Sequence, residues 1–563
     1  MSTIQSGEIL YALASGLLVS LLVTWAFLGF YRRALARTMR MVSNARDFDA
    51  GQPMAPPPPA RAFATHAQDD VRVRRGLVFA YAVAFGLSAA VLHAPPMFEL
   101  WRESSDGLGA LRAAIWWYPN WAAALFIIAA LVHAERRQTW LGFALVCAIG
   151  TVLAVAVPAL LRLATGRELT LELLLNAGYF LAGFGWTAAV PAALVYLTGR
   201  PRLRNVLPLV LVMVMSLSLV IAIVYHGFML LFAGTEPLEL TPIRLLAMNT
   251  GPASIILGAS LPVGWFAWRA AGALAARYRA RRFSDMQLLA DAWWGVIVAF
   301  GLTSLWRYGP STALVCAAGA YVVYFFGVRL LLRRLDLGRR GDGPALLLLR
   351  VFGHQQRTER LFDAVAARWR FTGPVAMIAG ADLALRSVDV DEALAFAHGE
   401  IESSYVADRA GLAARLHALQ QARVDPDGRY RIEEFFCFDD TWRPTLQALV
   451  ARSRVVLMDL RGFTASNAGC VFELQQLAGV GRVADCVFVA DENTDRALAE
   501  RSLARAPDAD ASVLSWIDLT HEDRSSRTLL RKRLLQVALG AAPPDSGRAH
   551  VHGLRRTDER ARG

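Results

Sequence analysis

Polar and charged side chains follow successive short apolar runs in the C-terminal part of this 563-residue chain, at the points where those runs end. Guanidinium groups bind phosphate oxygens in a bidentate way, and carboxylates accept hydrogen bonds from ribose hydroxyls. Any one of these residues could instead be a helix cap or a solvated loop residue, but their repeated position predicts one site for an anionic, ribose-bearing ligand. The candidate ligand-binding residues are Arg350, His354, Asp382, Asp439, Trp442, Asp459, Arg461, Thr464 and Asn467.

The segment 445–479 adds a candidate catalytic carboxylate. Its landmarks are Ser453 and Arg454, an apolar run at 455–460, and then Asn467, Cys470, Glu473 and Leu474. This order resembles the second half of a TIR (Toll/interleukin-1 receptor) domain. The resemblance implies a TIR-like α/β fold and makes Glu473 the catalytic residue that cleaves the nicotinamide–ribose bond of NAD, through an oxocarbenium-like state that a carboxylate can stabilise. The alternative is that Glu473 occupies the first turn of a helix because the positive end of the helix dipole favours it there.

Other chemistries find little support in the sequence. There is no GxxxxGK[ST] motif and no GxGxxG after an apolar run, which disfavours a P-loop ATPase or a Rossmann dehydrogenase. The five cysteines form no CxxC pair and no Cys/His cluster, so we expect neither a metal site nor a disulfide framework. NAD, as a substrate or a ligand, is the only small molecule indicated.

Alternating strands and helices must position these residues. Short apolar runs predict strands at 345–352, 374–380, 430–438, 454–460, 485–491 and 512–519. Amphipathic segments predict helices at 355–370, 389–405, 408–422, 441–452, 469–479 and 523–539. Strands that read as continuous apolar runs and alternate with helices are typical of a doubly wound parallel sheet. This pattern predicts a doubly wound, flavodoxin-like α/β domain over 341–543, which the resemblance given above makes TIR-like, followed by a disordered basic tail over 544–563.

The first 340 residues have a different character. The chain as a whole is 55% hydrophobic and 19% charged, outside the composition of an ordinary soluble protein. Apolar stretches near the length needed to cross a bilayer recur before residue 336 and predict nine transmembrane helices. Their approximate bounds are 9–30, 76–94, 113–133, 140–162, 173–197, 206–232, 252–272, 288–307 and 312–332. A cytoplasmic loop with a proline-rich stretch at 47–72 joins the first two and is expected to be an extended linker.

Arginine placement predicts the orientation of this transmembrane domain, residues 1–340. With the N-terminus outside, 24 of its 30 arginines lie on the inner side and six on the outer side, as the positive-inside rule requires. The α/β domain is then cytoplasmic, and we expect a location in a bacterial inner membrane. The predicted spans carry few ionisable residues, which disfavours a transporter with a regulatory domain.

Together these features predict a membrane-anchored signalling or defence protein with a cytoplasmic nucleotide-binding domain that cleaves NAD. The alternative is a receptor or scaffold without enzymatic activity, whose α/β domain binds a nucleotide or a partner protein. The expected partners are the lipid bilayer, a nucleotide and further copies of the chain. Residues 341–563 hold 29 basic and 31 acidic side chains, so nucleic acid is not an expected partner.

Overall fold

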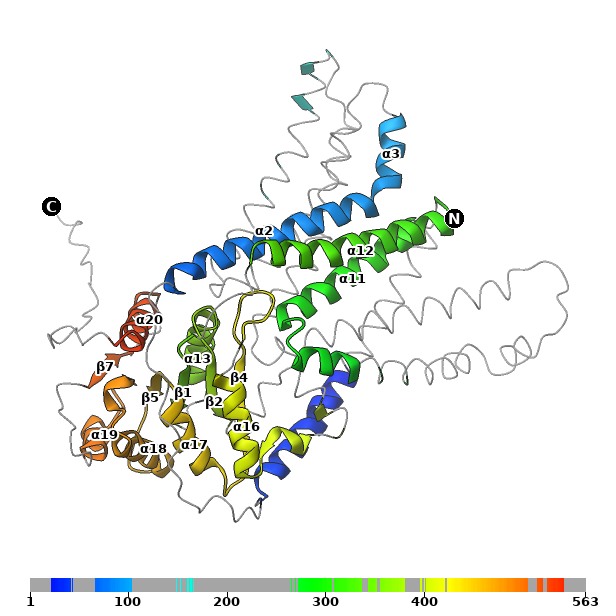
Figure 1. The fold of residues 1–563 in the computed structure, drawn as a ribbon. Helices are drawn as coiled ribbons and strands as arrows, with labels where there is room; N and C mark the ends of the chain where they lie inside the picture. Colours follow the sequence, from blue (N-terminus) through cyan, green and yellow to red (C-terminus); the bar gives the residue numbers. More distant parts are fainter. Residues whose placement is uncertain are drawn as a thin grey trace, which may run out of the picture.

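A computed structural model of the chain describes two connected parts, a bundle of helices and an α/β domain (Figure 1). The described residues are 22–41, 43, 66–103, 272–305, 308–336, 343–351, 355–379, 401–420, 423–504, 514–519 and 524–540, with isolated positions between 148 and 166 and at 265, 269, 395, 396 and 399. Of the predicted elements and sites, the spans 113–133, 140–162, 173–197 and 206–232, most of 252–272, the loop 47–65 and the tail 544–563 lie largely or wholly outside these residues.

The α/β domain contains a seven-stranded parallel sheet, which confirms the predicted α/β class. Its strands are β1 (Leu346–Arg350), β2 (Val375–Ala379), β3 (Tyr405–Val406), β4 (Ile432–Cys437), β5 (Val455–Asp459), β6 (Cys486–Ala490) and β7 (Ser515–Asp518). The strand order is β3-β4-β2-β1-β5-β6-β7. The chain moves outward from β1 to β2 on one side and from β5 to β6 on the other, so the order switches between β1 and β5. Parallel sheets bind ligands beyond the carboxyl ends of the strands at such a switch.

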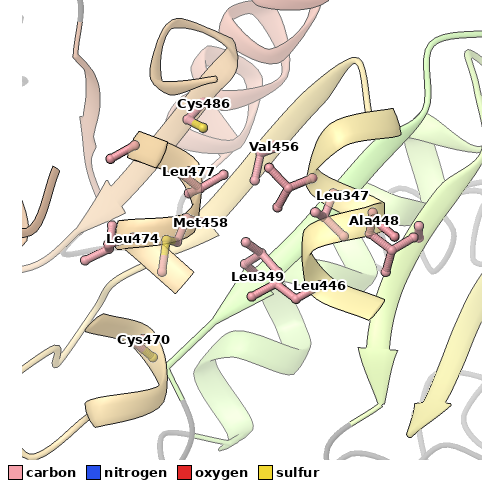
Figure 2. Close-up of a cluster of buried hydrophobic side chains, with 14 of the residues drawn as sticks. Leu347, Leu349, Leu446, Ala448, Val456, Met458, Cys470, Leu474, Leu477 and Cys486 are labelled. Atoms are coloured by element: carbon pink, nitrogen blue, oxygen red, sulfur yellow. The ribbon is translucent and has the colours of Figure 1, made fainter. Parts of the chain in front are cut away.

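Helices cover both faces of this sheet, because its strands alternate side chains between two apolar cores. Leu347 and Leu349 of β1 point toward the core under α17 (Trp442–Arg452) and α18 (Ala468–Gly479), as Figure 2 shows. Leu346 and Leu348 point to the opposite core, under α13 (Gln355–Trp369) and α20 (Arg524–Ala538). The remaining elements of the domain are α16 (Arg409–Gln420), α19 (Arg496–Leu503), η4 (Ile401–Ser404) and η5 (Val483–Asp485). The sheet is therefore the middle layer of three.

The helical bundle packs α2 (His66–Leu92), α11 (Asp285–Leu305) and α12 (Pro310–Arg334) side by side, and α3 (Ala94–Glu103) follows α2 (Figure 1). Phe85 stacks on Tyr324 with ring centroids 4.9 Å apart and contacts Trp294 edge-on at 4.8 Å. The Trp294 indole N–H donates to Ser88 Oγ at 2.9 Å, which ties α11 to α2. Small residues let the helices approach, since Gly327 of α12 faces Ala84 of α2.

Two helices in the described part of the chain are long and apolar enough to cross a membrane, over Arg72–Leu92 and Ser311–Arg334. They correspond to the predicted spans 76–94 and 312–332. The α11 helix covers the predicted span 288–307 but is not a third such helix. Of the nine predicted spans, the described residues thus contain two candidate membrane helices, and most of the other spans lie outside the described residues. In α12, Leu314, Val315, Phe326 and Leu330 are all more than half exposed.

An N-terminal helix, described from residue 22 to 39, packs on the α/β domain. Leu28, Tyr31 and Leu35 are buried against Ala379, Tyr405 and Phe436. Trp25 and Phe30, on other sides of the helix, are 78% and 62% exposed. The end of the first predicted span, 9–30, therefore contacts the α/β domain through one face, a contact that its apolar composition did not distinguish from contact with lipid.

A second contact between the two parts lies at the amino ends of the strands, just before β2 and β4 begin. Asp285, at the start of α11, accepts ion pairs from Arg370 at 3.3 Å and from Arg429 at 3.0 Å. Arg429 also pairs with the fully buried Asp427 at 2.7 Å. Arg281 pairs with Glu433 of β4 at 2.7 Å. The bundle thus contacts β2 and β4 near their amino ends, and the N-terminal helix contacts them near their carboxyl ends.

Candidate functional site

A cavity of about 290 Å³ lies at the carboxyl edge of the sheet, next to the switch between β1 and β5. Most of its wall is apolar, and one basic and two acidic side chains, Arg350, Asp439 and Glu473, also line it. The other lining residues are Met39, Leu348, Leu349, Phe362, Met377, Ile378, Ala379, Cys437, Phe438, Trp442 and Gly469. A mostly apolar cavity with a few converging polar groups is the usual form of a small-molecule site.

The α18 helix places Glu473 in this cavity. Leu474 and Leu477, on adjoining parts of the same helix, pack into the sheet core, which fixes the rotation of the helix (Figure 2). Near its start, the Cys470 thiol donates to the Arg350 carbonyl oxygen at 3.5 Å, which ties the helix to the end of β1. The helix begins at Ala468 and has no acidic residue in its first turn, so Glu473 sits in the second turn. The interpretation of Glu473 as a first-turn residue stabilised by the helix dipole is therefore wrong.

The Glu473 carboxyl group is almost fully buried. Only 5% of the residue is exposed, and its Oε2 atom has no hydrogen-bond partner among the described residues. Burial raises the pKa of Glu473 to about 8, and the positive charge of Arg350 opposes this rise. The carboxyl is thus mostly protonated at neutral pH in the ligand-free protein. It can donate one hydrogen bond and accept others, and a cation entering the cavity would favour its ionised form.

Arg350 and the residues after β4 supply the other polar groups of the cavity. Arg350 is the last residue of β1, is 4% exposed, and stands in register with Asp459 of β5. Asp439 is exposed and lies two residues after the end of β4. Trp442, the first residue of α17, packs edge-on against Phe472 of α18 with ring centroids 5.4 Å apart. Arg350, Asp439, Trp442 and Glu473 are thus brought to one cavity from four different elements.

Four other candidate residues shape the loop after β5 and do not line the cavity. Arg461 donates two hydrogen bonds of 2.8 Å to the two carboxylate oxygens of Asp459, and both side chains are buried. Asn467 accepts from the Thr464 backbone N–H at 2.9 Å, which closes a turn before α18. Their side chains therefore organise the loop that carries α18. His354 and Asp382 lie outside the described residues.

Sequence reasoning missed several lining residues. Met39 comes from the N-terminal helix, more than 300 positions from the rest of the site, and its position near the end of a predicted span gave no reason to place it there. Cys437 and Phe438 were part of the predicted strand 430–438, and their place at its carboxyl end was the available signal. In the described part of the chain, no group of three His, Cys, Asp or Glu side chains could hold a metal ion.

Comparison with known proteins does not name this site. A search against models of protein families found no match, and no curated protein matches the chain. The site must therefore be interpreted from its own geometry.

Proposed function

We propose that this chain is a membrane-anchored signalling protein whose cytoplasmic, TIR-like α/β domain binds a ribose-containing nucleotide in the Glu473 cavity. The observation that carries the proposal is the Glu473 carboxyl, which is buried in a cavity beyond the carboxyl end of β1 and whose Oε2 atom lacks a hydrogen-bond partner among the described residues. An unsatisfied buried polar group costs about 1–3 kcal/mol, so it is unfavourable unless a ligand can use it. A ribose hydroxyl supplies the missing partner.

The size and lining of the cavity limit what enters it. Its 290 Å³ is at the lower end of typical ligand pockets, which span about 300–1,000 Å³. It therefore accepts one sugar or one ring of a nucleotide, and the remainder must lie outside. Arg350 provides a positive charge beside Glu473, which suits a ligand that carries a phosphate next to its ribose. Trp442 offers an aromatic wall for a planar ring.

A second candidate function is cleavage of NAD, and the protonation behaviour of Glu473 favours it. The nicotinamide ring of NAD is a cation, so its entry would stabilise the ionised carboxylate of a group whose pKa is about 8 in the empty cavity. The bond between the ribose C1′ and the ring nitrogen would break with its electron pair leaving on nicotinamide. Water would then add to C1′ and release a proton, giving ADP-ribose. The Glu473 carboxylate would stabilise the positive charge that develops on the ribose.

Exposed apolar surface and arginine placement support the membrane anchor. The α12 helix exposes Leu314, Val315, Phe326 and Leu330 in a stretch long enough to span a bilayer. A lipid environment would cover these side chains. The concentration of arginines on one side of the predicted spans favours a cytoplasmic α/β domain, and contact between copies of the chain in the membrane is a means of controlling it.

The test uses the full chain purified in detergent, titrated with ADP-ribose and with NAD in a calorimeter, while released nicotinamide is followed by chromatography. We expect ADP-ribose to bind and Glu473→Gln to weaken binding. Glu500→Gln, on the exposed side of α19, is the matched control and should behave as the wild type. Nicotinamide release that Glu473→Gln abolishes would assign the second function. If neither compound binds, the proposal is wrong.

A further inference from the structure

The end of the N-terminal helix covers one side of the Glu473 cavity. Met39 belongs to this helix and lines the cavity together with Met377, Ala379 and Phe438 of the α/β domain. By strand register, Ala379 lies on the same sheet face as Met377, the face that α13 covers next to β1. The helix at 22–39 therefore continues the layer of α13 over β3 and β4, and its last residue, Met39, lines the cavity.

Hydrogen bonds fasten this helix end to the loop between β4 and α17. The Ser43 backbone N–H donates to both carboxylate oxygens of Asp440, at 3.0 and 3.2 Å, and Ser43 Oγ donates to Asp440 Oδ2 at 2.7 Å. The neighbouring Asp439 N–H donates to the Met41 carbonyl oxygen at 3.4 Å. The Asp440 carboxylate therefore anchors the N-terminal segment by accepting its hydrogen bonds. The side chain of the neighbouring Asp439 lines the cavity.

Apolar packing supports the same contact farther along the helix. Leu28, Tyr31 and Leu35 are buried against the domain, and the Tyr405 hydroxyl donates to the Leu35 carbonyl oxygen at 3.3 Å. The contact with α11 at the other edge of the sheet is independent of this one, because it involves Asp285 and the segment before β4. The N-terminal helix is thus held on the α/β domain by contacts of its own, and Met41 and Ser43 join its end to the β4–α17 loop.

We infer that Met39, Arg40, Met41 and Ser43 form a latch over one side of the Glu473 cavity, and that the membrane half controls access to the cavity by holding or releasing it. Release of the Ser43–Asp440 contact withdraws Met39 from the wall and frees the β4–α17 loop that carries Asp439. The identity of what then enters rests on the function proposed above, but the closing of the cavity does not.

A cysteine that already lines the cavity reports on the latch without any ligand. Cys437 is 7% exposed and lies beside Phe438 in the cavity wall. We would treat the full chain in detergent with N-ethylmaleimide and follow alkylation of Cys437 by peptide mass spectrometry. Cys486, fully buried elsewhere in the core, reports general unfolding in the same sample. Asp440→Ala removes three hydrogen bonds at an exposed site, so we expect Cys437 to react on the order of tenfold faster, with Cys486 unchanged.

Matched variants keep this test decisive. Asp495→Ala removes an exposed aspartate that accepts from the Leu498 N–H at the start of α19, away from the cavity, and should leave the Cys437 rate unchanged. Ser43→Ala removes the Oγ hydrogen bond to Asp440 and keeps the two backbone ones, so it should give a smaller increase, and it decides the matter if Asp440→Ala does not fold. An unchanged Cys437 rate in a folded latch variant, or an equal rise in Asp495→Ala, would overturn the latch. ADP-ribose is added in a separate arm: failure to protect Cys437 there would count against the proposed function alone.

Discussion

Replacing Glu473 by glutamine should stabilise the α/β domain, and the gain should depend on pH. Burial raises the pKa of Glu473 from 4.5 to about 8 in the folded protein. Its protonated form is favoured by folding, so the associated stability is fully present below pH 4.5 and is lost as pH rises toward the folded pKa. Glutamine has nearly the same shape and stays neutral, so it escapes this loss. The two proteins should diverge as pH rises.

The size of the effect follows from the same two pKa values. At 1.36 kcal/mol per pKa unit, the full penalty above pH 8 is about 5 kcal/mol, and at pH 7 it is about 3 kcal/mol. For a domain of roughly 200 residues, 1 kcal/mol shifts the melting temperature by about 2–4 °C. We therefore expect Glu473→Gln to melt about 6–12 °C higher than the wild type at pH 7, and the difference to shrink toward pH 5.

The assay is thermal unfolding of the full chain in detergent, followed by intrinsic fluorescence at several pH values between 5 and 8.5. Glu500→Gln, an exposed change of the same type, should melt as the wild type throughout. A Glu473→Gln protein that melts below the wild type at pH 8 would contradict the argument. So would a difference in melting temperature that stays constant with pH, because it would show that ionisation of Glu473 is not the cause.

Two further predictions concern the membrane half and its contact with the sheet. A reporter fused after Arg340 should be cytoplasmic and one inserted at Ser105 external, because of the arginine distribution; alkaline phosphatase activity at the first site would refute the topology. Arg429→Ala removes the partner of the fully buried Asp427, so it should cost about 3–5 kcal/mol and lower the melting temperature by about 10 °C. Arg501→Ala, exposed on α19, is its control, and equal melting of the two variants would contradict the importance of the buried pair.

The sheet could be predicted from sequence because its central strands are continuous apolar runs. Strands such as β1, β5 and β6 are buried at every position, and such runs between helices are typical of parallel sheets. The two-residue strand β3 was missed, and the predicted helix 389–405 ends on its first residue. A pair of residues at a sheet edge is too short to show a period, so no local pattern could have revealed it.

The candidate site was predictable in part, for the same topological reason. Parallel strands bring their following loops to one edge, which is why Arg350, Asp439 and Glu473 line one cavity despite their separation in sequence. Whether a charged residue at that edge faces a cavity or a neighbour depends on local geometry. Asp459 and Arg461, two positions apart, pair with each other at the end of β5. The sequence pattern is the same whether these side chains pair with each other or line the cavity.

The latch controls how strongly the Glu473 carboxyl is buried, and burial sets whether that carboxyl is charged. While the latch covers the cavity, burial keeps Glu473 mostly protonated, and a neutral carboxyl cannot stabilise a developing positive charge on a ribose. Opening the latch would admit water and a ligand together. Hydration lowers the cost of the carboxylate, so the pKa of Glu473 would fall toward its ordinary value and the group would ionise. A movement of the N-terminal helix would therefore change both the access to the cavity and the charge inside it.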